Sequence, residues 1–166
     1  VFGLNNGMVP IIAYNYGAGH KDRVIKTIKH SVAYGVGIMF VGLLAMHIFP
    51  AQLMRMFDAE ESLIAIGAPA LETISLSFVF AGFCIVAGSV FQALGNGVYS
   101  MIVSVARQMC VLLPVAKLLS MSGEVTLIWW AFPIAELASV LLTSYFLVRI
   151  YRKVICHIGE PVVQDA

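Results

Sequence analysis

The chain has 166 residues, of which 60% are hydrophobic and only 11% are charged, and its formal net charge is +1. A soluble domain carries about a quarter charged residues, because polar side chains must cover the surface that its core cannot bury. The composition therefore excludes an ordinary soluble domain and indicates an all-α, polytopic transmembrane helix bundle. The near-neutral charge provides no basic field for nucleic acid, so we expect no nucleic-acid partner.

The first residues, 1–14, are apolar, and we expect them to finish a membrane span that begins upstream. The stretch YNYGAGHKDR, 14–23, follows directly. Its two tyrosines suit an aromatic belt at the membrane surface, and its two glycines suit a left-handed helix cap. The stretch lacks the spacing of a Walker loop and the third glycine of a dinucleotide fingerprint. We therefore interpret it as a span emerging from the membrane and not as a phosphate site.

Four apolar segments follow along the chain. A transmembrane helix needs about 20 mostly apolar residues, and each segment is long enough. We predict spans over 28–49, 63–94, 98–119 and 125–150, with the membrane part of the second after Pro69.

Helix-breaking and capping residues agree with these limits. Pro50 closes the first span, because proline cannot continue a helix without losing a hydrogen bond. Asp58, three residues before Glu61, is typical of a helix N-cap, and Asn96 suits a turn that caps the third span. Pro114 and Pro133 lie inside spans, where each should distort its helix.

Basic residues are unequally divided between the two sides of this bundle. If the four spans alternate in direction, seven lysines and arginines share one side and two occupy the other. The positive-inside rule makes the first side cytoplasmic. We therefore predict a transmembrane bundle over 1–155 and a cytoplasmic C-terminal tail over 156–166. The seven residues are Lys21, Arg23, Lys26, Lys29, Arg149, Arg152 and Lys153; the two are Arg55 and Lys117.

Three polar residues fall near the middle of predicted spans: Arg107, Gln108 and Glu136. Such residues are costly in a membrane and usually mark a pathway, an ion site or a buried pair. We expect Arg107 and Glu136 to interact directly, through Gln108 or through water. The alternative is a protonated Glu136, with Arg107 extending to the cytoplasmic surface.

Motifs of catalysis and metal binding are absent from the sequence. It has no H-E-x-x-H and no G-x-S-x-G, which are signs of zinc hydrolases and serine hydrolases. Cys84, Cys110 and Cys156 are far apart and form no C-x-x-C pair. We expect no enzyme activity, no metal site and no cofactor.

Several motifs together resemble the multidrug and toxic compound extrusion (MATE) transporters. The family signature QPIIGYNYGA is similar to the stretch around Tyr14, Asn15, Tyr16, Gly17 and Ala18. Further similar stretches follow in the family's order and spacing, so the resemblance covers residues 3–153. These stretches are PIIAYNYGAGHKDRV (10–24), FQALGNG (91–97), VARQ (105–108) and WAFPIAELASVLLT (130–143), the last resembling the twelfth helix of the DinF-like bacterial branch.

The resemblance implies the C-terminal lobe of a two-lobed, twelve-helix antiporter in the cell inner membrane. The chain would supply the end of helix 8 and helices 9–12, with the missing N-terminal lobe, membrane lipids and small-molecule substrates as partners. The family exports cationic or amphiphilic compounds in exchange for Na⁺ or H⁺ by alternating access.

The resemblance leaves two questions open. Some branches carry a coupling carboxylate in helix 10, but residues 78–88 contain no acid, so the main ion site is expected in the N-terminal lobe. A lipid or polysaccharide flippase of the same superfamily is one alternative. A membrane subunit that does not transport is another, although such a subunit needs neither Arg107 nor Glu136.

Overall fold

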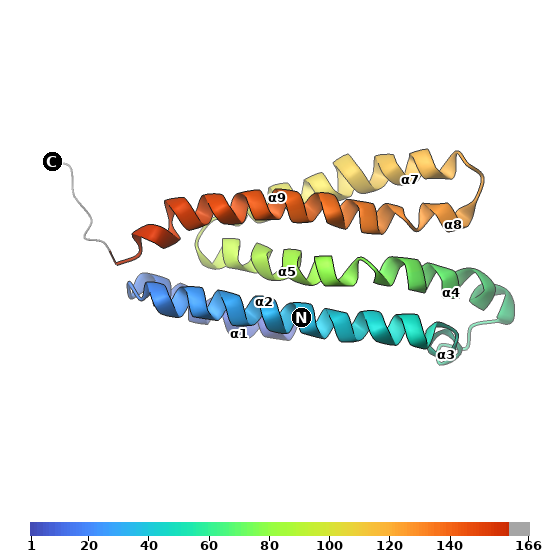
Figure 1. Ribbon diagram of the computed structural model, residues 1–166, viewed down its shortest axis with the longest axis horizontal. Coiled ribbons are helices and arrows are strands. Elements are labelled where there is room, and N and C mark those ends of the chain that lie inside the picture. The colour runs from blue at the N-terminus through green and yellow to red at the C-terminus, as the bar shows by residue number, and fades with distance from the viewer. Residues whose placement is uncertain (160–166) are drawn as a thin grey trace.

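The computed structural model describes residues 1–159, and every regular element among them is helical. The helices run side by side in an elongated bundle (Figure 1). Residues 160–166, which make up most of the predicted tail, lie outside the described residues. The elements are α1 (Phe2–Gly17), α2 (Lys21–Ile48), α3 (Pro50–Arg55), α4 (Glu61–Ser75), α5 (Phe78–Ala93), α6 (Gly97–Val105), the π-helix η1 (Ala106–Leu112), α7 (Leu113–Ser120), α8 (Val125–Ile128), α9 (Ala131–Lys153) and the short 3₁₀ helix η2 (Ile155–His157).

Three helical stretches within the described residues are long and apolar enough to cross a membrane: Lys21–Ile48, Gly97–Ser120 and Val125–His157. The pair α4 and α5, bent by 53°, makes a fourth if it counts as one span. These stretches correspond to the four predicted segments. The main difference is that α2 begins at Lys21 rather than at residue 28, so the charged loop of the prediction is already helical.

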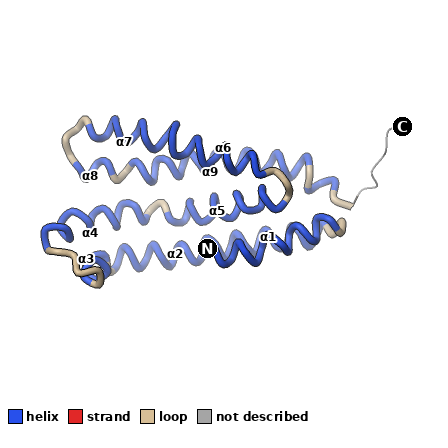
Figure 2. Tube along the Cα trace, turned by 180° about the vertical axis from the view of Figure 1, so that it is seen from behind, coloured by secondary structure: helices blue, strands red, loops and turns tan. Residues whose placement is uncertain are grey.

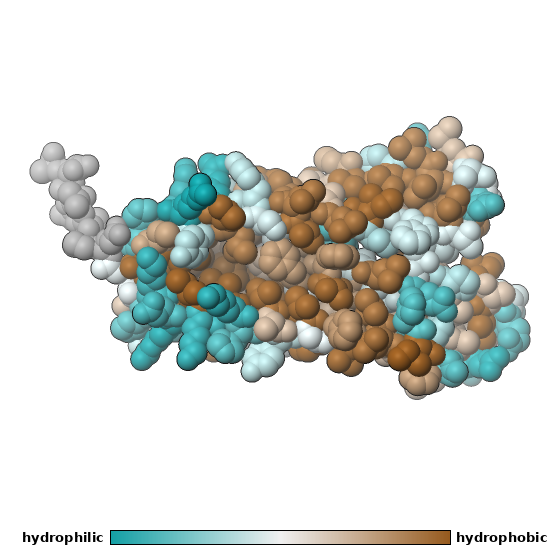
Figure 3. Space-filling view, in the orientation of Figure 1, coloured by the Kyte–Doolittle hydropathy of each residue, from teal (hydrophilic) through white to brown (hydrophobic). Residues whose placement is uncertain are grey.

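The alternating direction of the helices separates two ends of the bundle. We call one the basic end; it holds the α1–α2 loop, the α5–α6 turn and the C-terminal part of α9, at the left of Figure 1. The opposite end holds α3, the start of α4 and the α7–α8 turn, an order that the view from behind repeats (Figure 2). Hydrophilic residues gather at both ends and a hydrophobic band lies between them (Figure 3), as expected of a chain that crosses a membrane.

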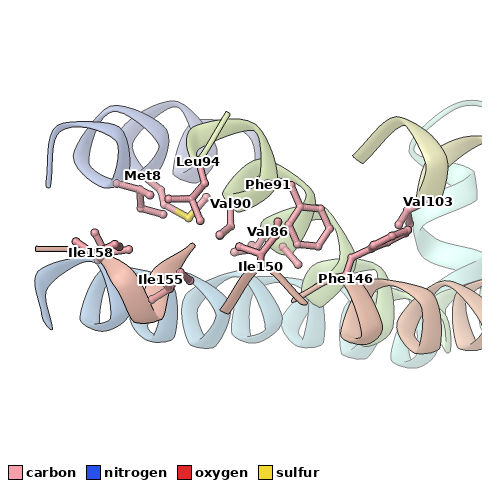
Figure 4. Packing of buried hydrophobic residues seen from close by; sticks show 13 residues of the cluster. Met8, Val86, Val90, Phe91, Leu94, Val103, Phe146, Ile150, Ile155 and Ile158 are labelled. Atoms are coloured by element: carbon pink, nitrogen blue, oxygen red, sulfur yellow. The ribbon is translucent and has the colours of Figure 1, made fainter. Parts of the chain in front are cut away.

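The hydrophobic core lies mainly in the half of the bundle nearer the basic end, where α1, α2, α5 and α9 meet (Figure 4). Phe91, Ile12 and Val24 are completely buried there. Tyr99 stacks on Phe146 at 4.6 Å between ring centroids and extends the cluster towards α6. The buried cluster comprises Met8, Ile12, Val24, Val86, Ala87, Val90, Phe91, Leu94, Val103, Phe146, Ile150, Ile155 and Ile158.

Two glycines allow α2 and α5 to pack closely. A Cβ atom added at Gly35 would lie 2.5 Å from Cγ2 of Val86, and one at Gly82 would lie 3.1 Å from the carbonyl oxygen of Gly35. Small residues let the backbones of membrane helices approach in this way. The interface between these helices therefore depends on the absence of side chains at both positions.

The break between α4 and α5 lies at residues 76–77, not at the proline. Pro69 is inside α4, which continues through it. At the break, Ser75 Oγ donates to the Glu72 carbonyl at 2.9 Å and Ser77 Oγ donates to the Ile74 carbonyl at 2.6 Å. Serine hydroxyls that bond to preceding carbonyls bend helices, which accounts for the position of this bend.

The two prolines that were predicted to distort spans, Pro114 and Pro133, each distort the helix just before them. A proline ring clashes with the carbonyl four residues earlier and removes the hydrogen bond to it. The π-helix η1 ends at Leu112, two residues before Pro114, and the Leu113 N–H donates to the Gln108 carbonyl five residues back. Likewise, the separation of α8 from α9 falls four residues before Pro133, at residues 129–130. The predicted distortions are thus present, each displaced towards the N-terminus.

The predicted side-chain caps do not form. Asp58 has φ +56° and lies outside α4, whose N-cap is Glu60 without a side-chain hydrogen bond. Asn96 is the N-cap of α6, but its Nδ2 donates back to the Leu94 carbonyl at 2.9 Å instead of serving the helix. Neither Asp58 nor Asn96 therefore caps the first N–H groups of the helix that follows it.

The segment after α9 packs against the α1–α2 loop and extends the bundle past the predicted boundary at residue 155. Ile155 and Ile158 are buried, and Lys21 Nζ donates to the Cys156 carbonyl at 2.8 Å. Gly19 and Gly159 approach so closely that a Cβ at Gly159 would lie 3.0 Å from the Gly19 carbonyl oxygen. The described part of the predicted tail is therefore part of the basic end.

Candidate functional site

Two polar stripes run along neighbouring helices in the middle of the bundle. One follows α6 into η1, and the other follows the first half of α9, which packs against both. Each repeats at intervals of three or four residues, so its members share one helix face. The stripes are Ser100, Ser104 and Arg107, and Glu136, Ser139 and Thr143.

An ion pair joins the two stripes. Arg107 Nη1 donates a hydrogen bond to Glu136 Oε1. The Glu136 side chain is 8% exposed and that of Arg107 is 40% exposed. The second carboxylate oxygen, Oε2, is buried and has no hydrogen-bond partner among the described residues. The two side chains thus meet directly, as expected, and Arg107 does not extend alone to the surface.

Gln108 does not take part in this pair. It follows Arg107 in η1, and its side chain is exposed. Of the expected arrangements, the structure therefore has the direct contact and not the one through Gln108. A π-helix has one more residue per turn than an α-helix and is frequent at functional sites. Here it is the local geometry that presents Arg107 to α9 and leaves Gln108 outside.

A cleft of about 520 Å³ lies beside the ion pair. Its walls come from α1, α5, α6, η1 and α9, and they include both polar stripes except for Glu136. Among the described residues that line it, Arg107 alone carries a charge. Two hydrogen bonds link its walls: Gln92 Nε2 donates to Ser100 Oγ at 3.1 Å, and Thr143 Oγ1 donates to Cys84 Sγ at 3.7 Å.

Sequence reasoning missed the contribution of α1 to this cleft. Asn5 and Asn6 both line it, and Asn5 Oδ1 is buried without a hydrogen-bond partner in the described part of the chain. Two consecutive amides in an otherwise apolar span were the available signal, because polar residues inside a membrane usually have a function. Gln92 was overlooked because it lies close to the α5–α6 turn.

The signature residues lie at the basic end, away from the cleft. Tyr14 is 74% exposed and Tyr16 is 39% exposed, whereas Asn15 is buried. Asn15 Nδ2 donates to the Ile11 carbonyl at 2.8 Å, and the Asn15 carbonyl accepts the His20 N–H at 2.9 Å. Asn15 therefore stabilises the end of α1 through its side-chain amide and stabilises the following turn through its backbone carbonyl.

The glycine turn of the signature differs from the expectation in one residue. Gly17 is the last residue of α1 and Ala18 is its C-cap in a right-handed conformation. Gly19, with φ +72°, is the residue in the left-handed region. It is also the glycine that contacts Gly159, so the turn needs it for both conformation and space.

The described residues include no group of three or more His, Cys, Asp or Glu side chains able to hold a metal ion. Cys84, Cys110 and Cys156 are all free thiols. The polar groups of the cleft are hydroxyls, amides and one guanidinium, which bind ligands by hydrogen bonds and charge.

The fold defines a polytopic membrane protein with a partly polar cleft between its helices. The family model for MatE matches residues 1–118. The chain belongs to this MatE family, whose members are membrane transporters and not enzymes. This confirms the resemblance that the sequence motifs indicated.

Individual relatives agree with the family. The chain is 24% identical over 153 residues to the multidrug export protein MepA of Staphylococcus haemolyticus (strain JCSC1435), covering 92% of this chain and 33% of that protein. It is 26% identical over 137 residues to MepA of Staphylococcus aureus (strain N315), covering 82% and 30%. A solved structure of the MATE multidrug transporter DinF-BH in complex with rhodamine 6G matches with a TM-score of 0.80 and 31% identity, over 93% of this chain and 34% of that one. The chain spans about a third of the length of these relatives.

Proposed function

We propose that this chain forms the C-terminal lobe of a secondary active transporter in the cell inner membrane. The complete protein would export organic cations or amphiphilic compounds in exchange for Na⁺ or H⁺, with its other lobe supplied by the N-terminal half. The observation that carries this proposal is the polar cleft of about 520 Å³ inside an otherwise apolar bundle. Ligand sites commonly have volumes of about 300–1,000 Å³, so the cleft has the size of a small-molecule site.

The chemistry of the walls supports a transport role over simple packing. An intramembrane ion pair is expensive to place in a membrane and usually marks a pathway, an ion site or a buried pair. Here the pair is retained beside the cleft, and hydroxyls and amides continue the polar surface. The likeness to a MATE transporter that holds rhodamine 6G favours drug-sized ligands.

We further propose that the main coupling ion binds in the N-terminal lobe. Residues 78–88 of α5 carry no acid. Glu136 is engaged by Arg107, and an ion-paired carboxylate is a poor site for a travelling cation because the arginine already neutralises it. In this proposal, Glu136 has a structural role and the lobe contributes the cleft.

The basic end is proposed to face the cytoplasm. Six of the seven lysines and arginines that the sequence placed on this side are in the first turns of α2 or the last turns of α9, and the seventh, Lys29, lies about two turns into α2. The positive-inside rule assigns such an end to the cytoplasm. The C-terminus would then be cytoplasmic.

The test uses the full-length polypeptide that contains this chain, expressed in a host without its own efflux pumps. Cells should accumulate less rhodamine 6G than vector controls, and a collapse of the ion gradient should abolish the difference. Ser104→Trp, which fills the cleft, should raise accumulation to the vector level. Val105→Trp is a matched control, because Val105 is exposed and lies outside the cleft lining. Equal accumulation with and without the wild-type protein would contradict the proposal.

A second arm tests the two-lobe arrangement. The 166-residue chain expressed alone should give no drug resistance, since it supplies only part of the cavity between the lobes. Resistance above the vector control would instead indicate a self-sufficient small transporter.

A further inference from the structure

We infer that the cleft binds the negatively charged group of an amphiphilic substrate, a carboxylate or a similar oxyanion, on the guanidinium of Arg107. The inference rests on the proposed function and specifies the class of substrate that this lobe recognises. Four observations support it: the sign of the charge in the cleft, the free donors of the arginine, the location of Glu136 and the division of the walls into polar and apolar parts.

The cleft presents a positive pole to a ligand. Of the described residues in its lining, only Arg107 is charged. The negative partner, Glu136, is absent from the lining and is 8% exposed, whereas 40% of the Arg107 side chain is exposed. A ligand entering the cleft therefore meets the cation first, and the low dielectric of the surroundings strengthens that interaction.

Most of the N–H donors of Arg107 make no hydrogen bond to the described residues. A guanidinium carries five N–H groups in a planar fork that fits a carboxylate with two parallel hydrogen bonds. In the described residues it makes a single side-chain hydrogen bond, through Nη1 to Glu136. The remaining donors can hold an oxyanion without breaking the ion pair, and the pair keeps the guanidinium in place when the cleft is empty.

The walls suit an amphiphile in one orientation. Ser104 lies one helical turn from Arg107 and adds a hydroxyl to the polar side. Ser139, one turn from Glu136, donates its hydroxyl to the Ala135 carbonyl at 2.9 Å. The α1 side contributes the apolar residues Phe2, Val9 and Pro10 beside Asn5 and Asn6. An amphiphile would place its acidic group at Arg107 and its apolar part against Phe2, Val9 and Pro10. A ligand that is only a cation gains nothing at the guanidinium and meets like charge there.

The experiment measures binding of two dyes to the purified full-length protein by fluorescence anisotropy. Rhodamine B carries a free carboxylate, and its ethyl ester is the same dye without one. The double variant Arg107→Gln/Glu136→Gln removes the cation without leaving a buried carboxylate unpaired. We expect it to weaken rhodamine B binding about tenfold, the loss of a hydrogen-bonded charge, and not to weaken binding of the ester.

Two single variants separate the cleft from general charge effects. Glu136→Gln keeps the guanidinium, so rhodamine B should bind at least as tightly as to the wild type. Arg149→Gln removes an arginine of α9 that lies outside this cleft, and it should change neither dye. An equal loss of rhodamine B binding in Arg149→Gln would overturn the inference.

The outcomes distinguish this inference from the proposed function. If the wild type binds both dyes and the double variant weakens them equally or not at all, the anion site is wrong and the transporter proposal stands. If the wild type binds neither dye, the proposed function fails and the inference fails with it.

Discussion

The two ends of this bundle are built differently. At the basic end, long helices meet through tight turns, and the largest buried side chains gather between α1, α2, α5 and α9. At the opposite end, α3, α7 and α8 contribute no buried residue, and the chain is interrupted at 49, 56–60, 121–124 and 129–130. The Arg107–Glu136 pair joins η1 to α9. One half thus holds most of the buried apolar cluster, while the other includes the short helices α3, α7 and α8.

This difference is understandable in a membrane. Lipid is as apolar as a leucine side chain, so helices associate by close van der Waals contact and polar interactions rather than by leaving water. The basic end has such contacts at Gly35 and Gly82. The opposite end has helix breaks, which transporters place where segments line a cavity or change position. We therefore interpret the basic end as the fixed base of the lobe.

The largest expected effect comes from cutting a core side chain at the basic end. Phe91→Ala removes a completely buried ring and should lower the free energy of unfolding by about 3–5 kcal/mol. Phe57→Ala, at the opposite end, removes a ring that is 86% exposed and should change it by less than about 0.5 kcal/mol. Denaturant unfolding of the purified full-length protein measures both. Similar losses would contradict the contrast between the ends.

The next largest effect comes from breaking the Arg107–Glu136 ion pair. Arg107→Gln leaves Glu136 buried and unpaired, which costs on the order of 3 kcal/mol, and should lower the amount of folded protein in the membrane. Glu136→Gln leaves a partly exposed arginine, so its effect should be smaller. Combining the two changes should restore part of the folded amount that Arg107→Gln loses.

The same variants test the structural role of Glu136. If this carboxylate carried a coupling proton, Glu136→Gln would leave abundance intact and abolish transport. That result would disprove the account of Glu136 as a partner of Arg107. The measurement needs both the protein amount on a blot and dye efflux from the same cells.

The smallest of the stability effects is expected from a change at the close contact between α2 and α5. Gly35→Val places atoms where Val86 already lies and should destabilise the α2–α5 interface by about 1–3 kcal/mol. Gly37→Val is its matched control on the same helix, because a Cβ there meets nothing within 4 Å. The midpoint temperature of thermal aggregation, measured on both purified variants, should be lower for Gly35→Val than for Gly37→Val. Equal midpoints would show that close contact at Gly35 is unimportant.

Much of the fold could be predicted from the sequence, because apolar length alone defines a membrane span. The interruptions could be predicted less well. Pro69 suggested a boundary, but α4 continues through it, and the real bend depends on the hydroxyls of Ser75 and Ser77. Serines inside spans have many possible roles, so the sequence did not distinguish a bend from ordinary packing.

The site was predictable only in its charged part. Arg107 and Glu136 attract notice because charge inside a membrane requires a partner. Gln108 attracted notice for the same reason, yet the π-helix before Pro114 leaves it exposed. Pro114 predicted a distortion of this helix but not which side chains the distortion would turn outward. Asn5 and Gln92 belong to the cleft through the packing of α5 against α1 and α6, which hydropathy does not reveal.

We propose that the packed basic end is the cytoplasmic base of the lobe and that the opposite end, with α3, α7 and α8, faces outward. Single cysteines at Glu60 and Arg152, in a full-length background without other cysteines, test it most directly. On intact cells, a membrane-impermeant maleimide should label position 60, and it should label position 152 only after permeabilisation. Labelling of position 152 but not of position 60 on intact cells would contradict the account.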